Sequence, residues 1–286
     1  MLILHDPQSA DYGSSMRPEQ PARITKSAAH LRAAHPDWEW RLPTPASDEA
    51  LLLAHAPEHL KRLTVPRDFD DDTPFFPDIA DHARRAAGAA LNAVDVALMD
   101  HRPAFSLMRP PGHHATAEEA MGFCYLNNVA IAARFAREKL LAPRVAIWDF
   151  DAHHGNGTEA IVRARNGILF TSVHQFPGYP GTGTRSFDNC RNWTVAPRTP
   201  RTEHMAVLRQ SLDAIVAFAP TVILVSAGFD AYIRDPITSM SLEIEDFATL
   251  GRWLREAGLP AAALLEGGYS DDLPLLIDAF VSTWKK

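Results

Sequence analysis

Two carboxylates and one imidazole in two distant segments are the strongest candidates for chemistry. Asp151 and His153 stand two residues apart, so their side chains point the same way if the backbone there is an extended strand end. Asp230 follows another apolar stretch and would supply a third ligand. One imidazole and two carboxylates suit a divalent ion with an open position for water, which is the arrangement of a catalytic metal site. The alternative is a hydrogen-bonded pair of Asp151 and His153 without metal.

A histidine pair and a tyrosine form a second set of candidates. His113 and His114 supply adjacent imidazoles, which suit the proton transfers of general acid and base catalysis. Zinc ligation by both is the alternative, but adjacent side chains usually diverge. Tyr269 follows Gly267 and Gly268, which permit a tight turn that would swing a phenol over a neighbouring site. A tyrosine that only packs at a loop is the other interpretation.

The elements between these residues must position them. Short apolar runs alternate along the chain with Ala-, Leu- and Arg-rich segments of helical spacing. This alternation predicts an α/β fold, a doubly wound parallel sheet flanked by helices, and a single domain over residues 1–286. The predicted strands are Leu2–Leu4, Ala104–Leu107, Val145–Trp148, Ile168–Val173, Val222–Val225 and Ala261–Leu265, and the predicted helices are Asp78–Met99, Asn127–Leu140, Glu203–Phe218, Glu243–Ala257 and Leu273–Trp284.

Five of these strands run directly into segments rich in chemically active residues. Ligands of open α/β sheets bind at the carboxyl ends of the strands, so parallel strands would bring the five segments to one rim. The stretch Val65–Pro77, rich in Pro and Asp, is predicted to be a long surface loop. The five segments are Arg109–His114, Asp149–Gly157, His174–Gly183, Ser226–Asp230 and Glu266–Tyr269.

Composition limits the classes of partner. The net charge of −7 gives no general electrostatic attraction to nucleic acid or to an anionic membrane. No apolar run has the length of a membrane-spanning helix, and the N-terminal residues do not have the pattern of a signal peptide. We therefore expect a cytoplasmic protein in which Cys124 and Cys190 are free thiols. Several of the 13 histidines fall in short polar clusters, which favours metal binding.

Six segments of the chain resemble the signature segments of the histone deacetylase family and follow one another in the family's order. The resemblance extends to Arg17–Arg23 near the N-terminus, so it covers nearly the whole chain. The run His153–Thr158 resembles the class II branch, which has many bacterial members. The six segments are Arg109–Ala115, Gly122–Asn128, Asp149–Thr158, Pro180–Gly183, Ser226–Asp230 and Glu266–Tyr269.

The resemblance implies one zinc ion per chain and an amide as substrate. Zinc on Asp151, His153 and Asp230 would activate water and polarise the carbonyl group. Tyr269 would donate a hydrogen bond to the oxyanion that forms. The family also holds a structural potassium ion near the zinc, through backbone carbonyls of residues 149–153 together with Ser172 and Val173. Arg23 matches an arginine below the pocket of the family, and the resemblance implies that it guides the release of acetate.

The resemblance also gives each histidine its own partner. Asp149 stands behind His113, and Asn156 stands behind His114. A carboxylate stabilises imidazolium and raises the pKa of a histidine more than a neutral amide does. We therefore expect His113 to favour the charged form and His114 to act as the neutral base, although relatives with aspartate in place of Asn156 leave the division of labour open.

The substrate side of the site is implied by the same resemblance. Phe123 and Tyr179 match the aromatic pair that lines an acyl-lysine tunnel, where aromatic walls hold a methylene chain. Gly122, next to Phe123, is predicted to bind substrate with them. Asp72, or one of the two aspartates before it, aligns with a rim carboxylate that accepts peptide N–H groups. Ile237 stands where a polyamine-selective relative carries glutamate, and an apolar residue there favours acyl-lysine.

The sequence therefore predicts a zinc-dependent amidohydrolase that removes acetyl or other short acyl groups from the ε-amine of lysine in peptides or proteins. Deacetylation of acetylpolyamines or other small N-acyl amines is the first alternative. A binuclear manganese ureohydrolase and a non-catalytic acyl-lysine binding module are the others, but the three-ligand set and Tyr269 favour one metal and catalysis. Hydroxamates chelate zinc through two oxygens and are expected to inhibit.

Overall fold

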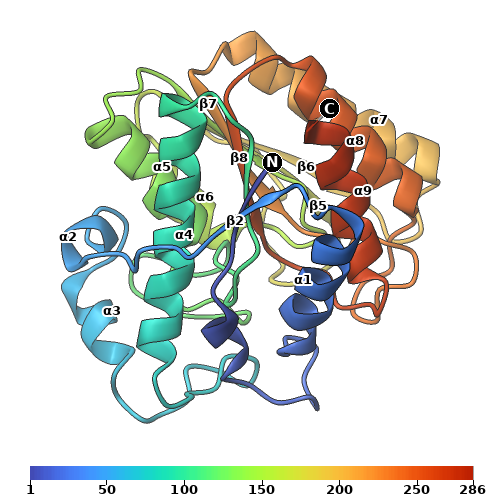
Figure 1. The fold of residues 1–286 in the computed structure, drawn as a ribbon. Coiled ribbons are helices and arrows are strands. Elements are labelled where there is room, and N and C mark those ends of the chain that lie inside the picture. The colour runs from blue at the N-terminus through green and yellow to red at the C-terminus, as the bar shows by residue number, and fades with distance from the viewer. Residues whose placement is uncertain (286) are drawn as a thin grey trace.

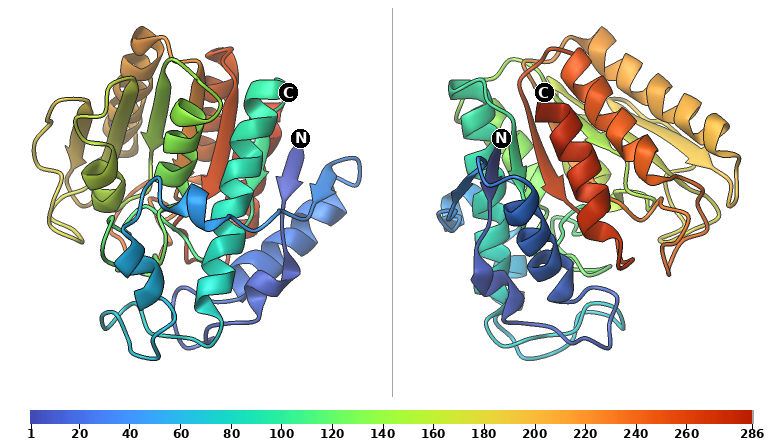
Figure 2. Two further views of the ribbon diagram at one scale, coloured as in Figure 1. Left: turned by 90° about the vertical axis from the view of Figure 1, so that its left-hand side faces the viewer. Right: turned by 45° about the vertical axis from the view of Figure 1, so that its right-hand side comes forward.

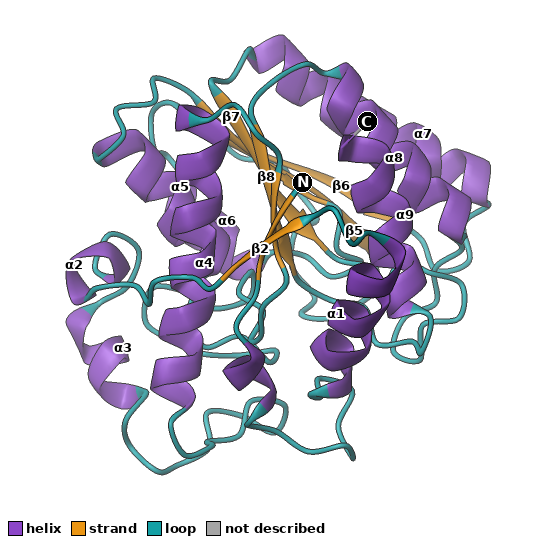
Figure 3. Cartoon of the chain, in the orientation of Figure 1, coloured by secondary structure: helices purple, strands orange, loops and turns teal. Residues whose placement is uncertain are grey.

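Eight parallel strands form one sheet in the computed structural model, which describes residues 1–285 (Figure 1; Figure 3). The strand order is β2-β1-β3-β8-β7-β4-β5-β6. Chain order and spatial order differ, so the connections cross over the sheet, as in other doubly wound folds. The strands are β1 (Leu2–Leu4), β2 (Glu39–Arg41), β3 (Ala104–Ser106), β4 (Val145–Asp149), β5 (Ile168–Gln175), β6 (Cys190–Val195), β7 (Val222–Ala227) and β8 (Ala261–Leu265).

Helices cover both faces of this sheet (Figure 1; Figure 2). In β4, Val145 and Ile147 pack into a core with α4 and α5, whereas Ala146 and Trp148 pack into a second core with α7, α8 and α9. This alternation is the period of two expected of a strand buried on both faces. The helices are α1 (Ala22–Ala34), α2 (Asp48–Leu51), α3 (Pro57–Arg62), α4 (Ile79–Met99), α5 (Asn128–Glu138), α6 (Asn156–Val162), α7 (Arg201–Phe218), α8 (Ile244–Glu256) and α9 (Leu273–Lys285), with a 3-10 turn η1 (Pro7–Ala10).

The carboxyl ends of the central strands lie level with one another. Asp149 at the end of β4 pairs with Ser226 of β7, and Ser226 pairs with Leu264 of β8. All neighbouring strands run parallel, so the loops that follow them meet at one rim. The prediction that the chemically active segments share one rim is confirmed by this topology.

The six predicted strands and five predicted helices are all present, with ends shifted by a few residues. The long loop Val65–Pro77 contains neither helix nor strand, as predicted. The strands β2 and β6 were not predicted, because both lie at edges of the sheet and have partly exposed, largely polar residues in place of an apolar run. Among the helices of residues 1–285 we find no candidate for a bilayer-crossing segment.

The start of α5 is tied to the loop that carries the histidine pair. Asn127 caps the helix by accepting the N–H of Ala130 at 2.9 Å. The amide nitrogen of the same side chain donates to the carbonyl of Ala115, also at 2.9 Å. One buried asparagine therefore fixes both the helix and the loop of the site.

Candidate active site

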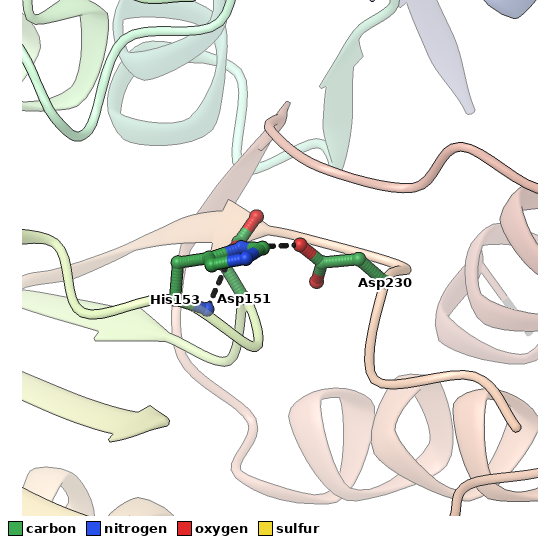
Figure 4. Close-up of side chains that lie close together, drawn as sticks. All are labelled: Asp151, His153 and Asp230. Atoms are coloured by element: carbon green, nitrogen blue, oxygen red, sulfur yellow. Dashed lines mark hydrogen bonds and ion pairs between the residues drawn. The ribbon is translucent and has the colours of Figure 1, made fainter. Parts of the chain in front are cut away.

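Three side chains able to bind a metal converge beyond the ends of β4 and β7. One donor atom from each of Asp151, His153 and Asp230 lies within 4.8 Å of the other two (Figure 4). The Nδ1 of His153 is 2.8 Å from Asp230 Oδ2 and 3.1 Å from Asp151 Oδ1. Both carboxylates are buried, and the imidazole is partly exposed. The three predicted ligands thus lie at one point of the rim.

The backbone that presents the first two ligands differs from the predicted one. β4 ends at Asp149, so Asp151 and His153 lie in a bend, and the prediction of an extended strand end was wrong. The N–H of His153 donates to Asp151 Oδ1 at 2.9 Å and closes this bend. A local hydrogen bond, rather than strand alternation, brings the two side chains together.

Two glycines allow the ligand loops to approach one another closely. A Cβ on Gly228 would lie 2.2 Å from Asp151 Oδ2, and a Cβ on Gly267 would lie 2.4 Å from Asp230 Oδ2. The N–H of Gly267 also donates to Asp151 Oδ2 at 2.7 Å. Any larger residue at either position would displace a carboxylate from the cluster.

The donor set fits a divalent cation by charge as well as by position. Burial, and next the charge of Asp151, raise the pKa of Asp230 to about 6. Two buried carboxylates this close repel one another, and a cation between them would relieve the repulsion. Three protein ligands of the imidazole and carboxylate types are a usual set for catalytic zinc. The residues present therefore fit one divalent ion.

The histidine pair lies beside this cluster, with each imidazole held by a different partner. Asp149 Oδ2 lies 3.1 Å from His113 Nδ1, and Asn156 Oδ1 lies 2.8 Å from His114 Nδ1. The two ring centroids are 4.0 Å apart, so these adjacent side chains run alongside one another and do not diverge as expected. The ring of His114 is 6.0 Å from the ring of His153, which brings the pair next to the metal-binding cluster.

The two imidazoles have opposite electrostatic surroundings. Burial alone would lower the pKa of His113, but the charges of Asp151 and Asp149 outweigh it and raise the pKa to about 10. For His114, burial and then the positive charges of His113 and His153 lower the pKa well below its ordinary value. Near pH 7 the first imidazole is therefore cationic and the second is neutral.

A cavity of about 260 Å³ connects these groups with the aromatic candidates. The ring of Tyr179 meets His114 edge-on at 5.0 Å, and the ring of Phe123 meets Tyr269 at 5.7 Å. A larger cavity of about 640 Å³ beside α4 contains none of the candidate residues, so we assign the chemistry to the smaller one. Its lining residues are Arg17, Pro18, Asp72, His114, Gly122, Phe123, His153, Tyr179, Ile237 and Tyr269, which include all five predicted substrate-binding residues.

The long loop Val65–Pro77 supports one wall of this cavity. Thr73 is buried, and its hydroxyl accepts the N–H of Phe123 at 3.1 Å. Phe123 has φ 68°, a left-handed conformation that is strained for a phenylalanine, whereas Gly122 before it adopts φ 56° freely. The loop holds this strained turn in place. Of the three neighbouring aspartates of the loop, Asp72 lines the cavity.

Tyr269 contacts both an arginine and a phenylalanine. The guanidinium carbon of Arg23 is 4.8 Å from the centroid of the phenol ring, and its Nε donates to the carbonyl of Gly268 at 2.8 Å. Gly268 has φ 115°, a conformation that glycine adopts and other residues avoid. Burial raises the pKa of Tyr269 well above its ordinary value, so the hydroxyl keeps its proton.

Two carboxylates that hold the site together were given no role of their own by reasoning from the sequence, although Glu266 stands in one of the predicted segments. Glu266 is fully buried, and its Oε2 accepts the N–H groups of Gly112 and His113 at 2.7 and 3.1 Å. A charged residue directly after the all-apolar strand β8 was a usable signal for this role. Asp235 accepts the N–H groups of Ile237 and Tyr269, and its position in an irregular loop gave no signal.

Comparisons with known proteins agree with the fold and the site. A family model described as the histone deacetylase domain matches residues 17–283. The histone deacetylase-like amidohydrolase of Pseudomonas aeruginosa is 36% identical over 279 residues, covering 91% of this chain and 73% of the relative. The acetylpolyamine amidohydrolase of Mycoplana ramosa is 35% identical over 213 residues, covering 69% and 61%. The crystal structure of the HDA15 HD domain has a TM-score of 0.91 at 28% identity, covering 99% of this chain and 90% of that one.

Sheet, site and relatives together define a hydrolase that acts on amide bonds. Amidohydrolase is the activity that the names of both relatives share, the family model is described as a deacetylase domain, and metal binding is typical of this fold. The chain belongs to the histone deacetylase family.

Proposed function

We propose that the protein removes acetyl or other short acyl groups from the ε-amine of lysine in peptides or proteins. One observation supports this most strongly: a single cavity has His114, His153 and Tyr269 in its wall together with aromatic and aliphatic side chains. A passage of this kind holds a methylene chain while polar groups at its end meet the amide. The same cavity would therefore both bind the lysine side chain and cleave its acyl group.

The metal in this proposal is one zinc ion per chain on Asp151, His153 and Asp230. When bound, zinc lowers the pKa of water and polarises a carbonyl group as a Lewis acid. A potassium ion held by backbone carbonyls of residues 149–153, with Ser172 and Val173, stays a prediction from the family resemblance.

The histidine pair would divide the proton transfers. The Nδ1–H of His114 donates to Asn156 Oδ1, which leaves the Nε2 lone pair free to take a proton from the attacking water. The same imidazole would then return the proton to the nitrogen of the leaving amine. His113, hydrogen-bonded to the carboxylate of Asp149, would be cationic and would stabilise the negative charge that develops beside it.

Tyr269 would stabilise the oxyanion of the tetrahedral intermediate. Its hydroxyl remains protonated because burial raises its pKa, so it can donate a hydrogen bond to a negative oxygen. Donors of this type contribute about 3–4 kcal/mol to transition-state stabilisation in other hydrolases. Arg23 and Phe123 both pack against the phenol ring and support it.

Acetylpolyamines are the second candidate substrate class, because one relative is named an acetylpolyamine amidohydrolase. Ile237 favours acyl-lysine, since this apolar side chain lines the cavity and offers no negative charge to a second ammonium group of a polyamine. The carboxylate of Asp72 at the same rim does not discriminate, because it could accept a peptide N–H or attract an ammonium group.

The test is a comparison of kcat/KM for acetyl-lysine peptides, longer acyl-lysine peptides and N-acetylspermidine with zinc-loaded protein. We expect acetyl-lysine peptide to be preferred by at least about tenfold, a difference of about 1.4 kcal/mol. A tenfold preference for N-acetylspermidine would assign the enzyme to small amines. The Tyr269→Phe protein, purified in parallel, controls for a contaminating deacetylase.

A further inference from the structure

One buried carboxylate connects two walls of the cavity. Asp235 lies in the loop between β7 and α8 and is 7% exposed. Its Oδ1 accepts the N–H of Ile237 at 3.0 Å, and its Oδ2 accepts the N–H of Tyr269 at 2.8 Å. Ile237 and Tyr269 both line the cavity, and they belong to different loops. The position of each therefore depends on the same side chain.

A buried carboxylate at this position destabilises the fold unless hydrogen bonds compensate its negative charge. None of the ion pairs found in residues 1–285 includes Asp235, and the charge of the nearby Asp230 adds repulsion. A buried anion without a cation is unfavourable, whereas a carboxylate can accept two N–H groups from different directions at once. The neutral amide of asparagine has only one oxygen and would present its own N–H group to one of the two donors.

Tyr269 needs such an anchor because the backbone before it is permissive. Gly267 and Gly268 precede it, and Gly268 has φ 115°. Neither glycine restricts where the chain places the next Cα, so the direction of the phenol depends on what holds the backbone of Tyr269. Arg23 binds the carbonyl of Gly268 on one side, and Asp235 binds the N–H of Tyr269 on the other.

We propose that Asp235 is a positioning residue for the hydrolytic reaction, which sets the hydroxyl of Tyr269 over the metal-binding cluster and ties it to the substrate wall at Ile237. This inference rests on the oxyanion-stabilising role proposed above for Tyr269. Asp235 itself does not line the cavity and makes no contact with the substrate in this account.

The test is a double-mutant cycle with Asp235→Asn and Tyr269→Phe. We expect Asp235→Asn to lower kcat by about 10- to 100-fold, the usual effect of losing a residue that orients a catalytic group. KM should change little, because the hydroxyl acts in the transition state. In the Tyr269→Phe background the same change at Asp235 should have almost no further effect on kcat, since the hydroxyl that it positions is gone.

Asp246→Asn is the matched control. Asp246 is also a buried aspartate that accepts a backbone N–H, that of Glu243 at 2.9 Å, but it lies at the start of α8 and does not line the cavity. Its replacement should lower the melting temperature and leave kcat unchanged. A general loss of stability is thereby separated from misplacement of the phenol.

A second readout does not depend on turnover. A Tyr269 hydroxyl that stabilises the oxyanion as proposed would also donate a hydrogen bond to an oxygen of a metal-chelating hydroxamate. The cycle can therefore be repeated with the Kd of a hydroxamate, measured by calorimetry. If wild-type protein binds the hydroxamate but hydrolyses none of the acyl amines tested, the proposed function fails while the Kd cycle still decides the role of Asp235.

Non-additive effects on kcat or on Kd, with zinc content unchanged, are the expected result. Equal losses from Asp235→Asn in both backgrounds, or no loss in either, would overturn the proposal. If the asparagine variant does not retain metal, the cycle is repeated with Asp235→Ser, which brings no amide N–H against the two donors. Loss of metal in both variants would also contradict it, because Asp235 would then act on the ligands and not on Tyr269.

Discussion

The inner wall and the outer rim of the cavity are built in opposite ways. On the inner wall, His114 is 4% exposed and hydrogen-bonded to Asn156, and His153 is bonded to two buried carboxylates. At the rim, the side chains of Tyr179 and Ile237 are each 38% exposed. The inner wall therefore offers a fixed geometry for bond cleavage, while the rim can adjust to the molecule that enters. Substitutions of inner residues should remove catalysis, and substitutions at the rim should alter the choice among substrates.

The largest effect is expected from the metal ligands. Asp230→Ala should abolish both zinc binding and hydrolysis, because the two remaining ligands, Asp151 and His153, no longer close the site. Zinc per chain, measured by elemental analysis, checks this directly. Asp72→Ala, which removes a carboxylate from the rim, should retain the metal. Two metals per chain in wild-type protein would instead favour a binuclear ureohydrolase.

Loss of the phenol hydroxyl should be the next largest effect. Tyr269→Phe should lower kcat by about 10²- to 10³-fold with little change in KM, since the lost hydrogen bond forms in the transition state. Steady-state kinetics with an acetyl-lysine peptide measure both constants. Tyr12→Phe, which alters a buried tyrosine outside the cavity, is the control and should keep kcat. An unchanged kcat in Tyr269→Phe would remove the oxyanion role.

A smaller effect tests the difference between the two histidines. Burial, and next the positive charge of His113, hold the pKa of His114 low, so this imidazole is neutral and able to accept a proton. Asn156→Asp would place a negative charge behind it, which favours the imidazolium and raises its pKa. A base with a raised pKa is protonated, and so inactive, up to a higher pH. The acidic limb of the plot of kcat/KM against pH should therefore shift to higher pH. A shift of one pH unit would equal about 1.4 kcal/mol.

The same profile in Tyr269→Phe is the control for that shift, because its limb should stay in place while its height falls. An unmoved limb in Asn156→Asp, with fold and zinc intact, would mean that His114 is not the titrating base. The roles of His113 and His114 would then be exchanged, or the limb would belong to the metal site.

The smallest effect is expected at the rim. Ile237→Glu should raise kcat/KM for N-acetylspermidine relative to acetyl-lysine peptide, because the carboxylate would pair with a second ammonium group. Exposed ion pairs contribute only about 0.2–1 kcal/mol, so the ratio should change by about fivefold at most. Ile237→Gln, similar in size and uncharged, is the control and should leave the ratio near the wild-type value. The same shift in both variants would assign the effect to shape, not charge.

The sequence was sufficient to predict that polar residues which follow apolar strands come together in the fold. Asp151, His153 and Asp230 were found because polar groups after buried strands gather at one rim of a parallel sheet. What holds them could not be predicted in the same way. The bend that closes on Asp151 and the two backbone bonds of Asp235 are local choices in loops, where neither periodicity nor strand register constrains the chain.

Prediction from the sequence also failed at the two edge strands of the sheet and was incomplete in the long loop. β2 and β6 have half-exposed residues, so the apolar signal that revealed the central strands was absent. Within the loop Val65–Pro77, the sequence left three adjacent aspartates equivalent. Contacts that exist only in the folded chain, among them those of Thr73 with Phe123 and of Arg17 with Asp71, hold the loop in the position that brings Asp72 to the cavity.

The most direct test of metal-dependent hydrolysis at this cavity is release of acetate from an acetyl-lysine peptide by protein that has been stripped of metal and reconstituted. We expect no release from the stripped protein and full recovery at one equivalent of zinc, with one acetate and one peptide carrying an unmodified lysine residue formed per turnover. Peptide binding without acetate release after reconstitution, or recovery only with two equivalents of manganese, would contradict it.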